Sequence, residues 1–281
     1  MLSIIIVNYK TPELLRDCVA SLKETIKKTG YEVIVVDVAS DGSTAEALAS
    51  LAEDDINLIE LKKNTGYSKA VNAGLRAARG EYYLILNADM EALTDSVDKL
   101  VEFTRDEASQ KNIGLIGPRL LGLDEKIQQS AFRFYTPLTI VLRRTFLGKL
   151  PWWRGHIDYF LMKDKNITTA DAPQPVDWLM GTAILTTKEA VKKVGLMDER
   201  FFMYFEDVDW ARRFWENGYK VFYYPKAVMR HRHGKASRKD GLAGIFSNKM
   251  TRAHIKSGFL YLLKYHFRTR TYLNKNSEPR S

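Results

Sequence analysis

Three acidic residues, Glu206, Asp207 and Asp209, directly follow the apolar and aromatic run 201–205 and begin a segment with helical periodicity. A carboxylate that emerges from apolar surroundings can take a proton from a hydroxyl group, as a general base does. Acids in the first turn of a helix are also stabilised by the helix dipole without any catalytic role. The preceding aromatic run favours a catalytic site over a solvated helix face.

A second group of polar residues follows short apolar runs in the first 90 residues. Each member comes directly after a run of strand length: Asn8 and Tyr9, Asp37, Asn64 with Gly66, and Asn87 with Asp89. In a parallel sheet the carboxyl ends of the strands line one crevice where ligands bind. Asp, Asn and Gly also end strands simply as turn formers. The glycine spacings of dinucleotide and P-loop sites are missing, which disfavours hydride transfer and ATP hydrolysis.

The elements that would position these residues alternate between strands and helices. Apolar runs predict strands at 2–7, 33–36, 56–61 and 82–86, and helices begin after Thr11-Pro12 and after Gly66. This alternation predicts an α/β fold with a mostly parallel central sheet flanked by helices. The second half predicts a strand at 176–185, which contains Trp178 and Gly181, a helix at 210–217 and a strand at 221–224. The aromatic and basic stretch 132–162 is either a core helix with a loop or an amphipathic, membrane-facing segment.

Length and composition indicate one globular domain with appendages. The chain has 281 residues, 45% of them hydrophobic, and a single cysteine, Cys18, which excludes an intrachain disulfide and is expected in the core. No Cys/His cluster has zinc spacing, no run has signal-peptide features, and no apolar run reaches the roughly 20 residues of a membrane span. We therefore expect a cytoplasmic protein.

Positive charge is concentrated at the C-terminal end. Residues 229–281 hold 13 Lys and Arg against two acidic residues, a net charge of +11, within a chain whose formal net charge is +9. Such a tail favours an anionic surface, either nucleic acid or a phospholipid leaflet. The stretch 258–267 is apolar and flanked by cations, which favours the inner face of the cell membrane over nucleic acid. The alternative is a C-terminal helix that packs on the body with a solvated basic face.

The motifs, taken in order from Ser3 to about His233, resemble the family 2 glycosyltransferases of the GT-A fold, especially the rhamnosyltransferase-like branch. The matching segments are residues 5–9, 35–37 with 41–43, 64–66 with 70–72, 86–89 and 205–209. The resemblance implies transfer of a sugar from a nucleoside diphosphate donor to an acceptor hydroxyl, with inversion at the anomeric carbon. It implies a GT-A domain over 1–228, with a nucleotide-binding half at 1–118 and an acceptor-binding half at 119–228, and a basic, helical, membrane-associating extension at 229–281.

The resemblance also implies roles for individual residues. The nucleotide would be bound by Asn8, Tyr9, Asp37, Asn64, Gly66, Asn72 and Asn87, in a pattern that suits a UDP- or dTDP-sugar. Mg²⁺ or Mn²⁺ would be held by Asp89, with His231 or His233, because a departing diphosphate needs a hard cation on oxygen ligands. The family's first aspartate is replaced here by Asn87. The two histidines are equally consistent with phosphate contact or with a solvated basic turn, and Arg230 and Arg232 would contact phosphate.

In the acceptor half, Asp207 matches the family's catalytic base, and Glu206, Asp209, Trp178 and Gly181 would line the acceptor or support the base. The expected acceptor is a polyprenyl-linked or other saccharide in cell-surface polysaccharide assembly, and a homodimer is left open. Two alternatives remain: a sugar-nucleotide-binding protein without catalysis, suggested by Asn87, and a nucleic-acid-binding protein that acts through its tail. Retention of Asp89 and Asp207 argues against the first alternative.

Overall fold

The computed structural model describes residues 1–49, 51, 56–232 and 249–265. The strands are β1 Leu2–Asn8, β2 Tyr31–Val38, β3 Ile56–Leu61, β4 Tyr82–Asn87, β5 Met90–Ala92, β6 Ile113–Leu121, β7 Ile127–Gln128, β8 Ala131–Phe132, β9 Gln174–Pro175, β10 Trp178–Leu179, β11 Ala183–Thr187 and β12 Lys220–His231. The α-helices are α1 Pro12–Thr25, α2 Ser43–Ala49, α3 Tyr67–Ala77, α4 Ser96–Lys111, α5 Pro137–Arg144, α6 Arg154–Phe160, α7 Lys188–Val194, α8 Glu206–Glu216 and α10 Lys249–Lys264, and the short 3₁₀ turns are η1 Phe146–Lys149, η2 Pro151–Trp153 and η3 Lys163–Lys165.

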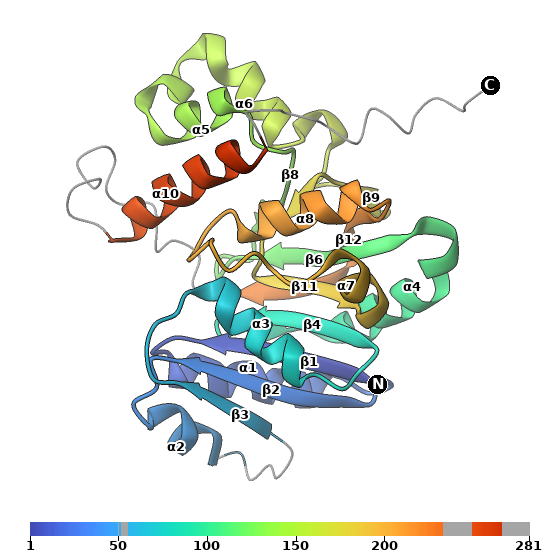
Figure 1. Ribbon diagram of the computed structural model, residues 1–281. Helices are drawn as coiled ribbons and strands as arrows, with labels where there is room; N and C mark the ends of the chain where they lie inside the picture. Colours follow the sequence, from blue (N-terminus) through green and yellow to red (C-terminus); the bar gives the residue numbers. More distant parts are fainter. Residues whose placement is uncertain (50, 52–55, 233–248, 266–281) are drawn as a thin grey trace.

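One mixed sheet organises the molecule, with strand order β3-β2-β1-β4-β11-β6-β12-β5 (Figure 1). The first four strands in this order are mutually parallel, whereas β11 runs antiparallel to both of its neighbours, β4 and β6. The predicted α/β class with a mostly parallel sheet is therefore confirmed. Because β1, β2 and β4 are parallel, their carboxyl ends share one edge, and the register pairs Asn8 with Asp37 and Val7 with Asn87.

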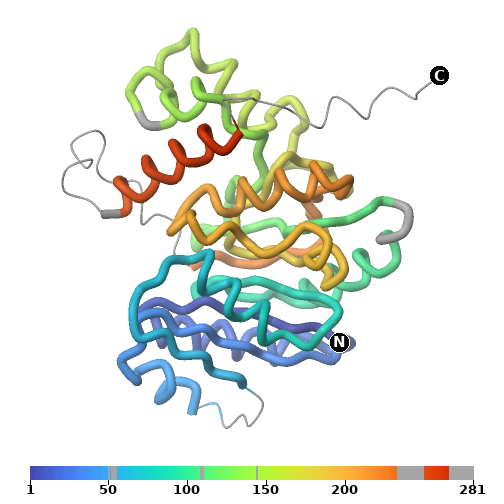
Figure 2. Tube along the Cα trace, viewed as in Figure 1, coloured from blue at the N-terminus to red at the C-terminus, as the bar shows by residue number. Residues whose placement is uncertain are grey.

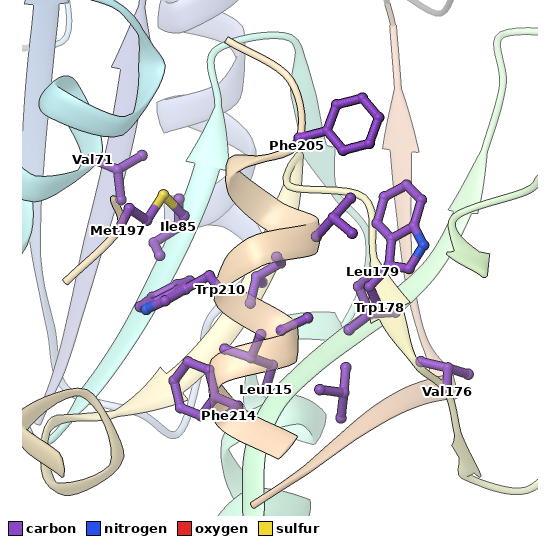
Figure 3. Close-up of a cluster of buried hydrophobic side chains, with 14 of the residues drawn as sticks. Val71, Ile85, Leu115, Val176, Trp178, Leu179, Met197, Phe205, Trp210 and Phe214 are labelled. Carbon is purple, nitrogen blue, oxygen red and sulfur yellow. The ribbon is translucent and has the colours of Figure 1, made fainter. Parts of the chain in front are cut away.

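Helices cover both faces of the sheet, so the core has two parts. Side chains of α1, α2 and α4, among them Cys18, form the first part, and side chains of α3, α7 and α8 form the second. In the second part, Trp210 and Phe214 of α8 lie over the sheet near Leu115 (Figure 3). Both α8 side chains are fully buried, so α8 is fixed along its length and its first turn has a defined position.

Several predicted boundaries are wrong for identifiable reasons. The predicted strand 176–185 is two strands, β10 and β11, and the break at residues 180–182 is where Gly181 bonds to other elements. Helix α8 begins at Glu206 rather than at Trp210, because Phe205, with φ of 67°, turns the chain before the acids. The predicted strand 221–224 is longer in the structure: β12 runs from Lys220 to His231, so Arg230 and His231 lie within it.

The second half also forms a small helical region above the sheet. Residues 132–162, for which a core helix or an amphipathic segment was predicted, contain α5, η1, η2 and α6. Helix α10 lies beside this region, and the trace in Figure 2 follows the chain from the sheet into it. Arg133 holds the region in place: its guanidinium forms a bidentate pair with Asp164 at 2.7 and 2.6 Å. In the described part of the chain, no helix is both long and apolar enough to cross a membrane.

Candidate active site

The carboxyl edge of β1, β2 and β4 brings the first group of predicted residues together. Asn8 is fully buried, and its amide donates to Asp37 Oδ1 and to Thr44 Oγ1, each at 2.9 Å. The side-chain oxygen of Asn8 accepts from the Thr11 hydroxyl, so Thr11 bonds to Asn8 instead of capping α1. Tyr9, next along the chain, is 48% exposed at the edge. The edge thus holds a fixed carboxylate beside an exposed aromatic ring, an arrangement suited to a nucleobase.

The glycine turn before α3 forms the next part of this edge. Asn64 accepts from the Gly66 amide at 3.1 Å, and Gly66 has φ of 92°, which only glycine adopts without strain. A Cβ at Gly66 would lie 2.4 Å from the carbonyl oxygen of Phe202, which also accepts from the Tyr67 amide at 2.7 Å. The turn is therefore packed directly against the loop that leads to the acids of α8.

Asn72, predicted to contact the nucleotide, is buried one turn further along α3. Its amide donates to the Met197 carbonyl and to Glu199, and its oxygen accepts from the Met197 amide. These bonds use both polar ends of the side chain. Asn72 thus ties α3 to the same loop before α8.

Three elements that are distant in sequence meet at residues 181–182. The Gly181 amide donates to Asp207 Oδ2 at 3.0 Å, and the Gly181 carbonyl accepts from the Tyr67 hydroxyl at 2.7 Å. The Thr182 carbonyl accepts from the Asn87 amide at 3.0 Å. A Cβ at Gly181 would lie 3.3 Å from the Asp207 Cβ, so the backbone at Gly181 is closely packed against Asp207. The break between β10 and β11 therefore links β4, α3 and α8 at one point.

Asp207 is electrostatically poised to take up a proton. Burial raises its pKa to about 6, although the amides of Gly181 and Val208 both donate to it. Burial raises the pKa of the neighbouring Glu206 well above its usual range, and the charge of Asp207 adds to that rise. Burial thus favours the protonated form of Glu206 more strongly than that of Asp207. A half-buried carboxylate with a pKa just below neutrality has the properties of a general base.

Asp209 has a different environment from Asp207, although both are in the first turn of α8. It is fully buried and forms ion pairs with Arg213 at 3.0 Å and with Lys264 at 2.6 Å. The Tyr265 hydroxyl also donates to it at 2.8 Å. Asp209 therefore joins α8 to the C-terminal end of α10 and supports the helical turn that carries Asp207.

Tyr67 was missed by the sequence prediction, although it directly follows the glycine turn. Burial raises the pKa of its phenol, and the negative charges of Glu206, Asp207 and Asp89 add to that rise. Tyr67 is thus close enough to the carboxylates of α8 and to Asp89 for their charges to act on it. The only signal in the sequence was its place after Gly66, and aromatic residues at such places serve equally often in the core.

Oxygen atoms and one imidazole at the end of β4 fit a divalent cation. Asp89 Oδ1 and Asn87 Oδ1 are buried, and neither has a hydrogen-bond partner among the described residues. His231 Nε2 lies 3.2 Å from Asp89 Oδ2, and its Nδ1 is 2.9 Å from Gln128 Oε1. The described residues contain no group of three or more His, Cys, Asp or Glu that could enclose a metal. Mg²⁺ and Mn²⁺ commonly take only one or two protein ligands when substrate phosphates supply the others, so this donor set fits them.

The remaining predicted residues either bond to other residues of the protein or lie outside the described residues. Arg230 pairs with Glu91 at 2.8 Å and with Glu125 at 2.7 Å, and Arg232 pairs with Glu91 and Asp17. These pairs fasten the end of β12 to β5 and α1. Trp178 is buried: its ring stacks on Phe132 with centroids 4.5 Å apart, and its Nε1 donates to the Arg133 carbonyl. His233 lies outside the described residues.

Comparisons with known proteins agree with this geometry. The chain is 27% identical over 278 residues to an N-acetylglucosaminyl-diphospho-decaprenol L-rhamnosyltransferase of Mycobacterium tuberculosis, covering 95% of this chain and 85% of that protein. It is 24% identical over 267 residues to the dTDP-rhamnosyl transferase RfbF of Shigella flexneri, covering 93% and 80%. Among solved structures, GalNAc-T7 with UDP, GalNAc and Mn²⁺ superposes with a TM-score of 0.62 at 14% identity, covering 97% of this chain and 52% of that one.

The model of the family described as "Glycosyl transferase family 2" matches residues 3–170, more than half of the chain. The matched residues include the strand-end motifs Asn8, Asp37, Asn64 with Gly66, and Asn87 with Asp89. The fold agrees with that of GT-A structures, and the predicted resemblance is confirmed. This chain is a glycosyltransferase and belongs to glycosyl transferase family 2.

Proposed function

We propose that the protein is an inverting glycosyltransferase that moves a sugar, rhamnose in the first instance, from a UDP- or dTDP-sugar to a hydroxyl of a polyprenyl-linked saccharide. The observation that carries this proposal is that the turn at 181–182 bonds both to the carboxylate of Asp207 and to the backbone amide of Asn87, which is two residues before Asp89. The names of the two rhamnosyltransferases support the choice of sugar, and the first supports the prenyl-linked acceptor.

The residues that bind the donor and those that act on the acceptor would lie on two sides of the turn at 181–182. On the donor side, Asp37 and Tyr9 would hold the base of the nucleotide, and Asp89 with His231 would hold Mg²⁺ or Mn²⁺. When bound, this cation would neutralise charge on the diphosphate. On the acceptor side, Asp207 would take the proton of the attacking hydroxyl, and single displacement would invert the anomeric carbon. Tyr67 and Gly181 would keep the carboxylate oriented toward that hydroxyl.

Release of nucleoside diphosphate tests this proposal. The protein would be incubated with a panel of UDP- and dTDP-sugars and a synthetic prenyl-diphosphate-linked acceptor, with Mg²⁺ or Mn²⁺, and the released nucleotide would be measured. Release that requires both donor and acceptor supports transfer. Donor binding without release, in the presence of every acceptor, would instead favour the sugar-nucleotide-binding alternative that Asn87 suggested.

A further inference from the structure

Helix α10 has apolar side chains on two faces. Its inner face packs on the body: Tyr261 is 1% exposed, and Ser257 donates to the Met203 carbonyl at 2.8 Å. Its outer face presents Ile255, Phe259 and Leu263, which are 43%, 58% and 47% exposed. These three residues are four apart, so they form one stripe along the helix. The apolar stretch noted at 258–267 is thus divided, with Tyr261 facing inward.

The outer face of α10 is also cationic. Arg252 and Lys256 are exposed within the same stripe, and the sequence of α10 contains no acidic residue. A face that combines large apolar side chains with cations, and lacks anions, matches the boundary between headgroups and acyl chains of an anionic leaflet. A protein partner of ordinary composition offers no comparable match to both properties.

Helix α5, which contacts α10, also exposes apolar side chains. A Cβ at Gly258 of α10 would lie 3.9 Å from Ile140 of α5, and Figures 1 and 2 show the two helices in the same upper part of the molecule. On α5, Leu138 and Val141 are 38% and 48% exposed. Two helices that are more than 100 residues apart in the sequence and in contact with each other therefore both expose apolar side chains.

Helix α10 also contacts the first turn of α8, which carries Asp207, and the residues before it. Lys264, at the end of α10, pairs with Asp198 at 2.7 Å and with Asp209 at 2.6 Å. A Cβ at Gly258 would also lie 3.2 Å from the ring of Phe205, the residue before α8. A partner that binds α10 therefore lies close to the acceptor side of the site.

We propose that the outer face of α10, together with Leu138 and Val141 of α5, docks on an anionic lipid leaflet and holds the acceptor side of the site at the membrane surface. The role of this docking in catalysis rests on the proposed lipid-linked acceptor, whereas the docking itself does not. The partner that we propose for this surface is the lipid leaflet, the same partner that the sequence predicted for the C-terminal extension.

Vesicle flotation of the full chain tests the proposal. The probes are vesicles of phosphatidylcholine, with or without phosphatidylglycerol, and no donor or acceptor is added. One variant carries Ile255→Gln, Phe259→Gln and Leu263→Gln, and a second carries Arg252→Gln and Lys256→Gln. The matched control carries Leu123→Gln and Ile127→Gln, which change exposed apolar residues near β7, outside the surface.

We expect the wild-type chain and the control to float with phosphatidylglycerol vesicles, and less so at higher salt. The triple variant should bind phosphatidylglycerol vesicles at least about tenfold more weakly than the wild type. The double variant should lose about fivefold for each cation removed. All three variants should unfold at the wild-type temperature, because the changed side chains are exposed.

Equal partitioning of the wild type and the triple variant would overturn the proposal, as would binding that is independent of phosphatidylglycerol. A triple variant that changes a dimer into a monomer, with vesicle binding unaltered, would show that a second copy covers the surface and would also overturn it. Turnover separates this result from failure of the proposed function. On a water-soluble acceptor the triple variant should turn over as fast as the wild type, and on a vesicle-embedded prenyl-linked acceptor it should be slower. If the wild type binds vesicles but turns over neither acceptor, the proposed function is refuted and the docking proposal is not.

Discussion

Replacing Asp207 with Asn should strongly reduce turnover and at the same time stabilise the protein at neutral pH. Burial raises the pKa of Asp207 from 3.8 to about 6, so the folded state holds the proton more tightly than the unfolded chain does. Stability is therefore lost as the pH rises from about 4 to about 6, and the loss is complete above pH 6. By pH 8 the ionised carboxylate costs the folded state about 3 kcal/mol.

Asn removes this cost and keeps most of the local geometry. Asp207 accepts from two backbone amides, those of Gly181 and Val208, and the single oxygen of Asn can satisfy only one of them. The lost hydrogen bond costs about 1 kcal/mol. We therefore expect a net gain of about 2 kcal/mol in the free energy of unfolding at pH 8, and no gain at pH 4. Turnover should fall by a factor on the order of 10² to 10⁴, with donor affinity little changed.

Urea denaturation at pH 8 and pH 4 measures the change in stability, and nucleotide release measures turnover. Asp209→Asn is the matched control in the same helical turn. Because Asp209 is fully buried and paired with Arg213 and Lys264, its replacement should cost about 3 to 5 kcal/mol at pH 8. If Asp207→Asn were as destabilising at pH 8 as at pH 4, the ionised carboxylate would not be strained. Near-normal turnover in that variant would rule Asp207 out as the base.

Three further predictions address the pH dependence, the metal and the glycine turn. The acid limb of kcat/KM should have its midpoint near pH 6, since Asp207 must be ionised to accept a proton, and a limb below pH 4.5 would contradict its raised pKa. Asp89→Ala should weaken Mg²⁺- or Mn²⁺-dependent donor binding by about tenfold or more, as measured by calorimetry, and wild-type activity that survives EDTA would remove the metal role. Gly66→Ala should lower turnover and cost about 1 to 3 kcal/mol of stability by urea denaturation, because its Cβ would lie 2.4 Å from the Phe202 carbonyl at a φ of 92°; wild-type values for both would refute the packing argument.

Local patterns predicted the elements of the nucleotide half well. β3 has the predicted bounds. β1, β2 and β4 differ from the prediction by at most two residues at either end, because continuous apolar runs specify strands that are buried on both faces. The strand-end residues Asn8, Asp37 and Asn87 were found for the same reason: parallel strands bring their carboxyl ends to one edge.

What sequence patterns could not predict depends on contacts between distant segments. The break at Gly181 exists because its amide and carbonyl bond to Asp207 and Tyr67, residues 26 and 114 positions away. Likewise, the family resemblance led us to expect that Arg230 would contact phosphate. Only the fold places Glu91 opposite it in the β5–β12 register, where the two form an ion pair.

The anomeric configuration of the product tests the central claim most directly, because it reports the displacement that Asp207 is proposed to assist. The protein would be supplied with dTDP-β-L-rhamnose, a prenyl-diphosphate-linked acceptor and Mg²⁺, and the new glycosidic linkage would be assigned from its one-bond C–H coupling by NMR. A single displacement with Asp207 as base predicts an α-linked rhamnosyl product. A β-linked product would contradict it, because retention requires a mechanism in which Asp207 is not the base of one direct displacement.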